Sequence, residues 1–544
     1  MARYDAVFVG SGINALASAA LLSREGWSVC VLERDERVGG AIRTVSDFTL
    51  PGFTHEVLSS WHPLFQGSAT YAELGEELGQ RGLEYRNTEL PTATAFPDGA
   101  AMFLHTALEA NVAEFERHAT GDGAAWETQF GAFMANADLG FGVLGAELWS
   151  AQGLRLGRTA LKRLGKQGTL AFLGSTLASC RDWCGATFAS ERAHGLLAPW
   201  VLHTGLGPDQ ASSGFMTQVI ACALQLGGMP VPVGGGIRLV ETLTGMVTDA
   251  GGVVRTSAPV ERIVVSGGRA TGVTLTGGEV VGAQRAVVAG VTPTQLYGPL
   301  LGNAAPADAK AAAARYRYGR AGMQLHLALD EAPRWRGPDA ERLGRTAIVH
   351  VSAGLDGVSR AVNEAERGLL PAEATIVVGQ PCAVDPSRAP EGKSILWIQL
   401  QELPAGRVRG DAAGDLDIGD GTWTEELREA YADRICARLG TSIENLAGAT
   451  LKRVALSPLD LEALNPNLVG GDIYSGSCAL DQNLLWRPFA QAPGHKTAVE
   501  GLWHIGASTH PGPGLGAGSG YLVAKALTRR PLPKRLLAKL PGRS

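Results

Sequence analysis

The spacing of hydrophobic positions changes twice within the first forty residues. An apolar run over residues 6–9 is followed by a glycine-rich turn, and then by a longer stretch of Ala and Leu that stops at Gly26. A second apolar run, residues 29–32, ends in Glu33. Short apolar runs bounded by turns are typical of buried strands, and the stretch between them is typical of a helix. The pattern predicts a β-α-β unit.

The turn inside this unit carries the residues that a dinucleotide site needs. Gly10 permits a tight turn, Gly12 lets the backbone approach a pyrophosphate, and Ala15 is small enough for close packing of helix on strand. The helix N-terminus offers N–H groups to phosphates. The acid after the second strand can accept both ribose hydroxyls. The alternative is a turn that binds nothing. The site is predicted at Gly10, Ser11, Gly12, Asn14, Ala15 and Glu33.

Periodicity predicts further elements along the chain. Helices are expected over residues 71–78, 107–118, 124–137, 215–226 and 425–439. Short strands are expected over 253–254, 258–265, 272–275, 286–290, 323–329, 375–379 and 394–400. Strands that alternate with helices after a β-α-β start indicate an α/β protein.

Composition narrows the class of protein. A net charge of −5 argues against a general nucleic-acid binder. The seven cysteines are scattered, which fits a reducing cytoplasm. Only Cys180 and Cys184 are close, and two ordinary helix cysteines are favoured over a metal or redox pair. No cluster has metal-ligand spacing, no run of eighteen apolar residues is present, and no signal-peptide pattern precedes the first strand. We therefore expect a cytoplasmic protein without a metal.

A second glycine pair follows the acid and decides between dinucleotides. Residues 34–44 include Arg34, Gly39-Gly40, Ala41 and Arg43. With the first turn, this stretch resembles the flavoprotein family of phytoene desaturases, carotenoid ketolases, retinol saturase and, more remotely, amine oxidases. The resemblance implies FAD as the cofactor. The chain departs from it at Ala41, where many members carry Arg, and Arg43 is the candidate to replace that contact.

The C-terminal part of the chain carries the second strong signal. Residues 501–521 contain a predicted strand, a glycine-dense turn and a helix start, with the sequence Gly-Ala-Ser-Thr-His-Pro-Gly at residues 506–512. This sequence resembles the last motif of bacterial carotenoid desaturases and ketolases. A helix N-terminus there would suit the negative charge of a reduced flavin. The alternative is a phosphate-binding or structural turn. The predicted flavin contacts are Gly506, Ala507, Gly514, Leu515, Gly516 and Ala517.

The resemblance implies roles for further residues. Ser59, Ser60, Trp61 and His62 would lie beside the flavin ring or the substrate, although each could belong to a structural turn. The backbone at Val260 would contact the adenine, and Ala289 would pass the pyrophosphate. The candidates for a catalytic role are His510, His62 and Trp61.

A domain organisation follows from the two FAD signals. We predict a discontinuous Rossmann-like FAD-binding domain made of residues 1–70, 227–300 and 490–544, with an inserted α+β substrate-binding domain of residues 71–226 and 301–489.

Two basic stretches suggest contact with an anionic membrane surface. Residues 148–180 contain no acid and interleave Arg and Lys with Leu at near-helical spacing, as in interfacial helices. Residues 525–544 have the same composition. The alternative is a solvated helix face with an ordinary core side.

The sequence therefore predicts an FAD-dependent oxidoreductase that dehydrogenates or oxygenates a long hydrophobic isoprenoid or carotenoid-like substrate. No second dinucleotide turn is evident, so the electron acceptor is expected to be oxygen or a quinone. One alternative is an amine-oxidase-type flavoprotein that oxidises a soluble metabolite. Another is a protein that binds the flavin without catalysis.

Overall fold

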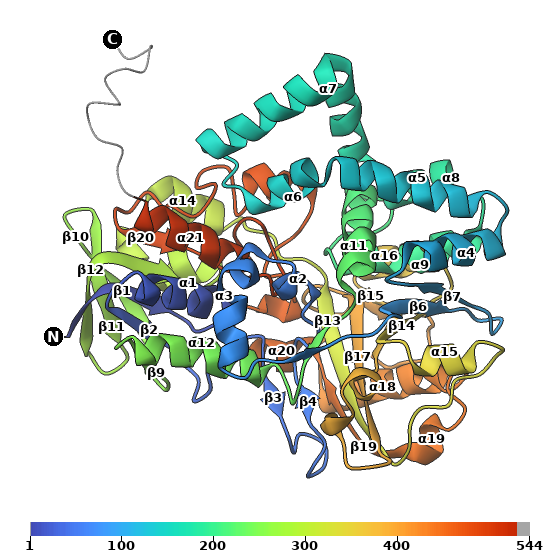
Figure 1. Ribbon diagram of the computed structural model, residues 1–544. Helices are drawn as coiled ribbons and strands as arrows, with labels where there is room; N and C mark the ends of the chain where they lie inside the picture. The colour runs from blue at the N-terminus through green and yellow to red at the C-terminus, as the bar shows by residue number, and fades with distance from the viewer. Residues whose placement is uncertain (1, 530–544) are drawn as a thin grey trace.

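Two seven-stranded sheets organise the chain, whose computed structural model describes residues 2–529 (Figure 1). In the first sheet, five strands run parallel and two add an antiparallel edge. The parallel strands are β9 (Val253–Arg255), β2 (Val29–Leu32), β1 (Arg3–Val9), β12 (Val280–Ala289) and β20 (Leu502–His504). The edge is β10 (Val260–Ser266) and β11 (Arg269–Leu275).

Four helices share a hydrophobic core beside this sheet. They are α1 (Ile13–Arg24), α3 (Ala69–Gln80), α12 (Ile237–Asp249) and α21 (Gly518–Thr528). Leu16, Leu74, Leu243 and Val523, one from each helix, belong to a single buried cluster with Phe8 of β1. A parallel sheet with the chain crossing over through α1 is the Rossmann-like arrangement, so the predicted fold class is confirmed.

The second sheet, here called the roof sheet, has one face covered by α18 (Glu425–Leu439). Leu325 and Ile398 point to that face and pack with Tyr431. The alternate residues point to the opposite or inner face, which packs against α9, α10 and α11. Its strand order is β19 (Thr450–Leu456), β13 (Ala321–Leu329), β17 (Ser394–Leu403), β16 (Ile376–Gly379), β14 (Ile348–Val351), β6 (Thr92–Ala95) and β7 (Ala101–Leu104).

The helices whose bounds have not yet been given form one large group, within residues 108–227, and several separate elements. The larger group is α4 (Leu108–His118), α5 (Asp122–Ala135), α6 (Ala137–Gly145), α7 (Ala151–Leu177), α8 (Cys180–Thr187), α9 (Glu191–Leu197), α10 (Pro199–Leu202) and α11 (Ser213–Gly227). Short elements complete the fold: β3 (Thr44–Val45), β4 (His55–Glu56), α2 (Pro63–Gln66), β5 (Tyr85–Arg86), β8 (Val231–Pro232), α13 (Pro293–Gln295), α14 (Ala307–Ala313), α15 (Ala340–Gly344), α16 (Leu355–Glu366), β15 (Leu369–Leu370), α17 (Pro381–Val384), β18 (Gly410–Asp411), α19 (Leu446–Ala449) and α20 (Pro458–Leu464).

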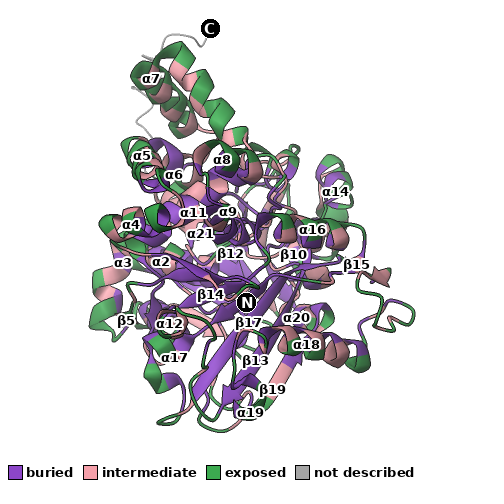
Figure 2. Ribbon diagram, turned by 90° about the vertical axis from the view of Figure 1, so that its right-hand side faces the viewer, coloured by how far each residue is buried: buried purple, intermediate pink, exposed green. Residues whose placement is uncertain are grey.

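Helix α7 stands away from the body of the molecule (Figures 1 and 2). None of its residues is buried, and it bends at Gly165, whose φ is 66°. The strand and helix positions predicted from periodicity are all present, the five helices as α3, α4, α5, α11 and α18. The domain boundaries stay a prediction. The strands of the first sheet do come from three separate stretches of the chain.

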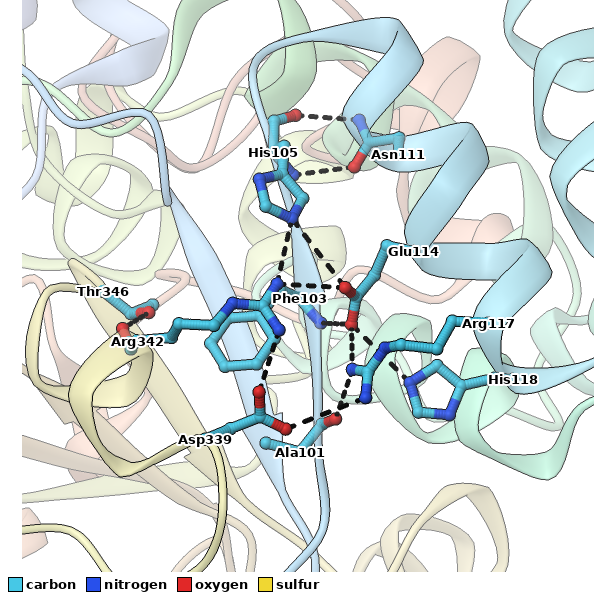
Figure 3. Close-up of polar contacts among 10 residues, drawn as sticks. All are labelled: Ala101, Phe103, His105, Asn111, Glu114, Arg117, His118, Asp339, Arg342 and Thr346. Carbon is cyan, nitrogen blue, oxygen red and sulfur yellow. Dashed lines mark hydrogen bonds and ion pairs between the residues drawn. The ribbon is translucent and has the colours of Figure 1, made fainter.

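A charged cluster joins α4 to α15 and to β7 of the roof sheet (Figure 3). Glu114 is buried and accepts hydrogen bonds from Arg117 Nη2 (2.6 Å), Arg342 Nη2 (3.0 Å) and the Phe103 backbone N–H (3.2 Å). His118 Nε2 and His105 Nε2 lie 3.6 and 4.0 Å from its carboxylate. Burial alone would raise its pKa, but these partners hold the pKa of Glu114 well below its usual range. We call these residues the Glu114 cluster.

Candidate functional site

Three parallel strands of the first sheet end side by side at glycines. Gly10 follows β1, Gly290 follows β12, and Gly506 comes shortly after β20. Val9 and Ala289 are register partners, and the Gly290 N–H donates to Val9 O at 2.9 Å. A Cβ on Gly10, whose φ is 92°, would lie 3.5 Å from Gly290 O. Ligands of such sheets bind outside the carboxyl ends of the strands, which is where these turns meet.

The N-terminus of α1 has no side-chain cap. A Cβ built on Gly12, its N-cap residue, would meet no atom within 4 Å, so space is open beside the backbone there. The second glycine pair lies against this turn: a Cβ on Gly40 would be 3.0 Å from Gly12 Cα, and the Gly39 N–H donates to Ser11 Oγ at 3.1 Å. The structure thus brings the two predicted glycine motifs together.

Glu33 is buried and holds the turn in place. Its Oε2 accepts hydrogen bonds from Ser11 N (3.0 Å) and Ser11 Oγ (2.6 Å), and its Oε1 accepts from Asp35 N (3.0 Å). The backbone N–H of Ala258 donates to Glu33 O at 2.8 Å, which places the Val260 segment beside it. Arg43 pairs with Asp35 at 2.6 Å, a contact that the sequence did not predict. Arg34 is exposed.

The N-terminus of α21 is tied to α1 through Asn14. Asn14 Oδ1 accepts hydrogen bonds from Ser519 Oγ (2.9 Å) and Gly520 N (3.2 Å). Ser519 Oγ in turn accepts from Gly506 N at 2.8 Å. A Cβ on Gly520 would lie only 2.0 Å from Asn14 O, so the two helices cross at backbone contact distance. Asn14 therefore belongs to both predicted motifs, and Ser519 is a supporting residue that sequence reasoning missed.

Three helix N-termini differ in how their first N–H groups are used. In α12, the N–H of Gly236 donates to Glu56 Oε1 (2.7 Å) and that of Ile237 to Thr44 Oγ1 (2.9 Å). The N-cap residues of α1 and α21, Gly12 and Ala517, contribute no capping side chain. Free N–H groups at a helix start attract anionic ligand groups. The N-terminal ends of α1 and α21 are therefore the ones suited to bind an anionic group of a ligand.

The segment from Ser59 to Leu64 joins both halves of the site. The Ser59 N–H donates to Ala41 O at 3.0 Å. A Cβ on Gly514 would lie 2.6 Å from Leu64 Cδ1, so α2 lies directly beside the turn that carries Leu515 and Gly516. Leu58 O accepts hydrogen bonds from two side chains of the roof sheet, Gln324 Nε2 (2.9 Å) and Trp397 Nε1 (3.2 Å). The same segment is thereby fixed to the roof sheet.

The three catalytic candidates lie in different surroundings. Trp61 lies against Gly379 of β16: a Cβ there would be 3.2 Å from its Nε1. His62 Nδ1 is 3.0 Å from the hydroxyl of Tyr85. Burial, with a smaller contribution from the charge of Arg388, lowers the pKa of His62 to about 3. Within residues 2–529, Trp61 Nε1 and His62 Nε2 have no hydrogen-bond partner.

His510 is also buried and uncharged. Burial, and then the neighbouring His495, lower the pKa of His510 to about 4. Its two ring nitrogens find no partner in the part of the chain that the structure describes. Its carbonyl oxygen lies 2.7 Å from His495 Nε2, and His495 Nδ1 lies 2.6 Å from Glu147. Burial keeps His510 and His62 neutral near pH 7 and disfavours their protonated forms, so both are weak bases.

Arg487 is a second supporting residue. Its guanidinium is buried and donates to three carbonyl oxygens, those of Ala507 (2.7 and 2.9 Å), Tyr474 (3.1 Å) and Ser477 (3.2 Å). It therefore fixes the loop that carries the predicted flavin contacts. The available signal was the Leu-Trp-Arg-Pro stretch at residues 485–488, which resembles a late motif of the desaturase-like flavoproteins. Ser60 Oγ, in contrast, is buried without a partner among the described residues.

The sequence profile of the flavin containing amine oxidoreductases matches residues 16–435. The chain belongs to this family. As a member it is an FAD-dependent oxidoreductase. In residues 2–529, no three His, Cys, Asp or Glu side chains are grouped to hold a metal ion. Within that same range, no helix combines the length and apolar character needed to span a bilayer.

The curated relatives of this flavoprotein are similar to it along nearly the whole chain. A limonene dehydrogenase component from Castellaniella defragrans is 25% identical, with 96% of this chain and 94% of that protein covered. Hydroxyneurosporene desaturase of Cereibacter sphaeroides is 28% identical, with 99% and 98% covered. Phytoene desaturase (lycopene-forming) of a Paracoccus species is 30% identical over 58% of each chain. The flavoprotein is therefore phytoene desaturase-like, as its two glycine-rich motifs predicted.

Solved structures show the fold of this flavoprotein. A triple mutant of putrescine oxidase has a TM-score of 0.59 at 14% identity, with 99% of both chains covered. Cyclohexylamine oxidase of Brevibacterium oxydans has a TM-score of 0.56 at 15% identity, with 97% of this chain and 100% of that chain covered. At this identity the likeness concerns the architecture alone, which agrees with a Rossmann-like FAD-binding fold.

The residues of the candidate site fit FAD. The open space beside Gly12 and the uncapped start of α1 can receive a pyrophosphate. At the start of α21, Asn14 Oδ1 accepts from the Gly520 N–H, and the N–H groups of Gly518 and Ser519 remain to receive the polar edge of the ring system. Ser60 Oγ and Trp61 Nε1 are buried donors that need an acceptor. When bound, FAD accepts two electrons from a substrate C–H bond.

Proposed function

We propose that this flavoenzyme dehydrogenates or oxygenates a long hydrophobic isoprenoid or carotenoid-like molecule. The observation that carries the proposal is the similarity, over 96% or more of the chain, to two proteins whose names specify isoprenoid substrates, the short limonene and the long hydroxyneurosporene. The fold neighbours named as amine oxidases are only 14–15% identical, and they share the architecture without pointing to a substrate.

The chain's own residues would position the substrate rather than activate it. A polyene has no group to protonate, so the site needs alignment and exclusion of water more than a strong acid or base. Leu58, directly before the segment from Ser59 to His62, is fixed to the roof sheet through its carbonyl oxygen. Within the proposal, this attachment limits how closely the substrate can approach the flavin site. In the same proposal, Trp61 closes this side of the site, and His62 and His510 contribute neutral, weakly basic side chains.

The electron acceptor in this proposal is oxygen or a quinone. The glycine motifs of the chain are accounted for by one FAD site, and residues 300–490 show no further strand-GxGxxG-helix unit for a nicotinamide cofactor. Stopped-flow reoxidation of the reduced enzyme separates the two acceptors. Rapid reoxidation by dissolved oxygen assigns oxygen. Slow reaction with oxygen but rapid reaction with a water-soluble quinone analogue assigns a quinone.

The test of the substrate class is anaerobic bleaching of the flavin. Holoenzyme is mixed with a panel of carotenoids, shorter isoprenoids and amines, and the visible absorbance of the oxidised flavin is followed. We expect bleaching by isoprenoids only. Bleaching by a soluble amine would replace the proposal with the amine-oxidase alternative. Bound FAD that no compound reduces would favour a non-catalytic flavin protein.

We further propose that α7 docks on an anionic membrane surface from which the substrate is taken. Its large apolar side chains are half exposed or more: Leu154 58%, Leu161 53%, Leu170 60%, Leu173 52% and Leu177 51%. The exposed cations on the same helix are Arg155, Arg158, Lys162, Arg163 and Lys166. Helices of this composition bind at the interface of anionic bilayers. Of the second basic stretch, residues 530–544 lie outside the described part of the chain.

Vesicle flotation tests the docking. We expect binding to phosphatidylserine-containing vesicles at low salt, and weakening as salt screens the charges. Lys162→Glu/Lys166→Glu should weaken it strongly, because the two changes lower the summed charge of the five cations from +5 to +1, whereas Glu341→Gln on the distant α15 should not change it. If wild-type protein does not float with the vesicles, membrane docking is wrong.

A further inference from the structure

A row of buried polar side chains crosses the inner face of the roof sheet. Gln324 of β13 and Gln399 of β17 are register partners. Gln399 also pairs with Val377 of β16, and Val377 pairs with His350 of β14. Register partners point to the same face, so the two glutamines and His350 lie in one row. Neighbouring strands are about 4.8 Å apart, which makes the row about 14 Å long.

Helix α10 and its C-cap complete the row from the helical side. Gln401 Nε2 donates to Gln399 Oε1 at 2.9 Å and lies 3.4 Å from His203 Nδ1. His203 Nε2 lies 3.1 Å from His350 Nε2, and the ring of Trp200 is 4.4 Å from that of His203. We call this set the polar band: Trp200, His203, Gln324, His350, Gln399 and Gln401.

The hydrogen bonds fix which histidine nitrogens carry protons. The amide nitrogen of Gln401 can only donate, so His203 Nδ1 accepts and its proton is on Nε2. His203 Nε2 then donates to His350 Nε2, which leaves the proton of His350 on Nδ1. Burial lowers the pKa of His203 to about 3 and that of His350 well below its usual value, so each ring carries one proton near pH 7.

The polar band contains donors and acceptors that nothing else in the described chain satisfies. His350 Nδ1 and Trp200 Nε1 are donors without a partner, and Gln324 Oε1 and Gln401 Oε1 are acceptors without one. These four side chains are at most 4% exposed. Buried polar groups in native proteins are nearly always paired, with protein, water or ligand. Four unpaired atoms in the polar band therefore point to a binding site.

The band begins at the turn that flanks the flavin site. Gln324 Nε2 donates to Leu58 O, directly before Ser59 and Ser60. A group bound in the band would lie within the length of the row from this turn. Trp397, Val377 and Ile348 make much of the inner face apolar and lie in the cluster that also contains α9 to α11. Thr92, Thr94 and His326 are further buried polar residues on this face, outside the band. The site combines a hydrophobic surface with one polar subsite.

We infer that the polar band binds a hydroxyl group of the substrate, so that the enzyme takes an isoprenoid alcohol in preference to a plain hydrocarbon. A hydroxyl donates and accepts at once, so it can pair with either kind of free atom in the band. An ether only accepts, and a hydrocarbon does neither. The inference rests on the proposed isoprenoid substrate and makes its class narrower.

Binding of three matched probes to the oxidised holoenzyme tests the inference. The probes are geranylgeraniol, its methyl ether and the corresponding hydrocarbon without oxygen, each delivered in detergent micelles and followed by perturbation of the flavin spectrum. We expect Kd of the alcohol to be about tenfold below that of the hydrocarbon, which corresponds to about 1.4 kcal/mol, with the ether between them. Equal Kd values for alcohol and hydrocarbon would mean that water fills the band, and would overturn the inference.

Variants show whether the preference comes from the band. Gln401→Met and His350→Phe should reduce the alcohol-to-hydrocarbon ratio to about one. The matched control is Gln225→Met, which removes a buried glutamine whose Oε1 is already used by Asn111 and Trp126. It should leave the ratio unchanged. Because the ratio is measured within one variant, a loss of folded protein does not alter it. An undiminished ratio in Gln401→Met overturns the inference.

The proposed function fails in a recognisably different way. If none of the three probes binds and none bleaches the flavin, the isoprenoid substrate and the hydroxyl subsite are both wrong. If the hydrocarbon binds as tightly as the alcohol and still bleaches the flavin, only the hydroxyl subsite is wrong.

Discussion

The Glu114 cluster and the polar band are both buried and polar, yet their hydrogen bonding differs. In the Glu114 cluster, one carboxylate receives two guanidinium groups and a backbone N–H, and two imidazoles lie within 4.0 Å (Figure 3). In the polar band, four buried atoms of Trp200, Gln324, His350 and Gln401 have no partner among the described residues. Within the Glu114 cluster, His118 Nε2 is the buried side-chain atom without a partner among the described residues. A buried carboxylate with a full set of donors indicates a structural role, whereas four unpaired atoms in one band indicate a place for a ligand.

The largest effect is expected at the Glu114 cluster. We expect Glu114→Ala to lower the free energy of unfolding by about 3 kcal/mol, because it leaves two guanidinium groups and a backbone N–H without their acceptor. The control on the same helix is Glu109→Ala, an exposed position where the change should stay within about 0.5 kcal/mol. Urea unfolding measures both. Loss of flavin reduction in folded Glu114→Ala would contradict a purely structural role.

The second prediction compares two buried glutamines. Gln225→Met should cost about 2 kcal/mol of unfolding free energy, because the Nδ2 of Asn111 and the Nε1 of Trp126 both lose their acceptor. Gln401→Met should cost about 1 kcal/mol, since the substitution also removes an oxygen that has no partner among the described residues. Urea unfolding of the two variants gives the order. The reverse order would show that the band is structural.

The third prediction separates the two regions by pH. The pKa of Glu114 is depressed in the folded protein. Its contribution to the free energy of unfolding is therefore present above about pH 4.3 and is lost as pH falls below that value. The histidines of the band have folded pKa values below about 6.5, so their contribution to the free energy of unfolding is present above that pH and is lost as pH falls towards 3.

Unfolding measured from about pH 7 to pH 4 tests this separation. His350→Phe should reduce the slope of unfolding free energy between about pH 6 and pH 5 by at most about 1.4 kcal/mol per pH unit, the value for one proton. Glu114→Gln should leave this window unchanged and flatten the curve below about pH 4.3. Identical curves for His350→Phe and the wild type would show that His350 does not stay neutral in the folded protein.

The smallest shift in Tm is expected from stabilisation by the ligand. At ten times Kd, geranylgeraniol should add about 1.4 kcal/mol, which raises Tm of a chain of this size by about 1 °C. Glu114→Gln should show the same rise from a lower starting Tm, and Gln401→Met should show a smaller one. Differential scanning calorimetry measures the shift. A rise that depends on Glu114 rather than on Gln401 would reverse the assignment of the two regions.

Local sequence patterns predicted the elements, because each pattern and its element occupy the same few residues. The turn at Gly10 and Gly12, with a strand before it and a helix after it, needs no distant contact to be recognised. The late glycine turn around Gly514 is local in the same way. The strands of the roof sheet were likewise visible as apolar runs, for example residues 394–400 in β17.

The polar band could not be predicted, because it depends on strand register and on a helix far away in sequence. In β17, Gln399 and Gln401 are only two polar residues at alternate positions. Their meaning comes from the pairing with Gln324 and from His203, 198 residues before Gln401. The contact between Asn14 and Ser519 was hidden for the same reason, since their sequence separation is 505 residues.

The hydrogen bond between Asn14 and Gly520 has a consequence for biosynthesis. The two residues are 506 positions apart, so the first β-α-β unit leaves the ribosome long before its partner exists. At about 5–20 residues per second, the delay is roughly 25 to 100 s. During that time α1 lacks the helix that crosses it, so we expect the nascent chain not to retain a flavin. Cofactor loading therefore belongs to the end of translation, and stalled or truncated chains should emerge colourless.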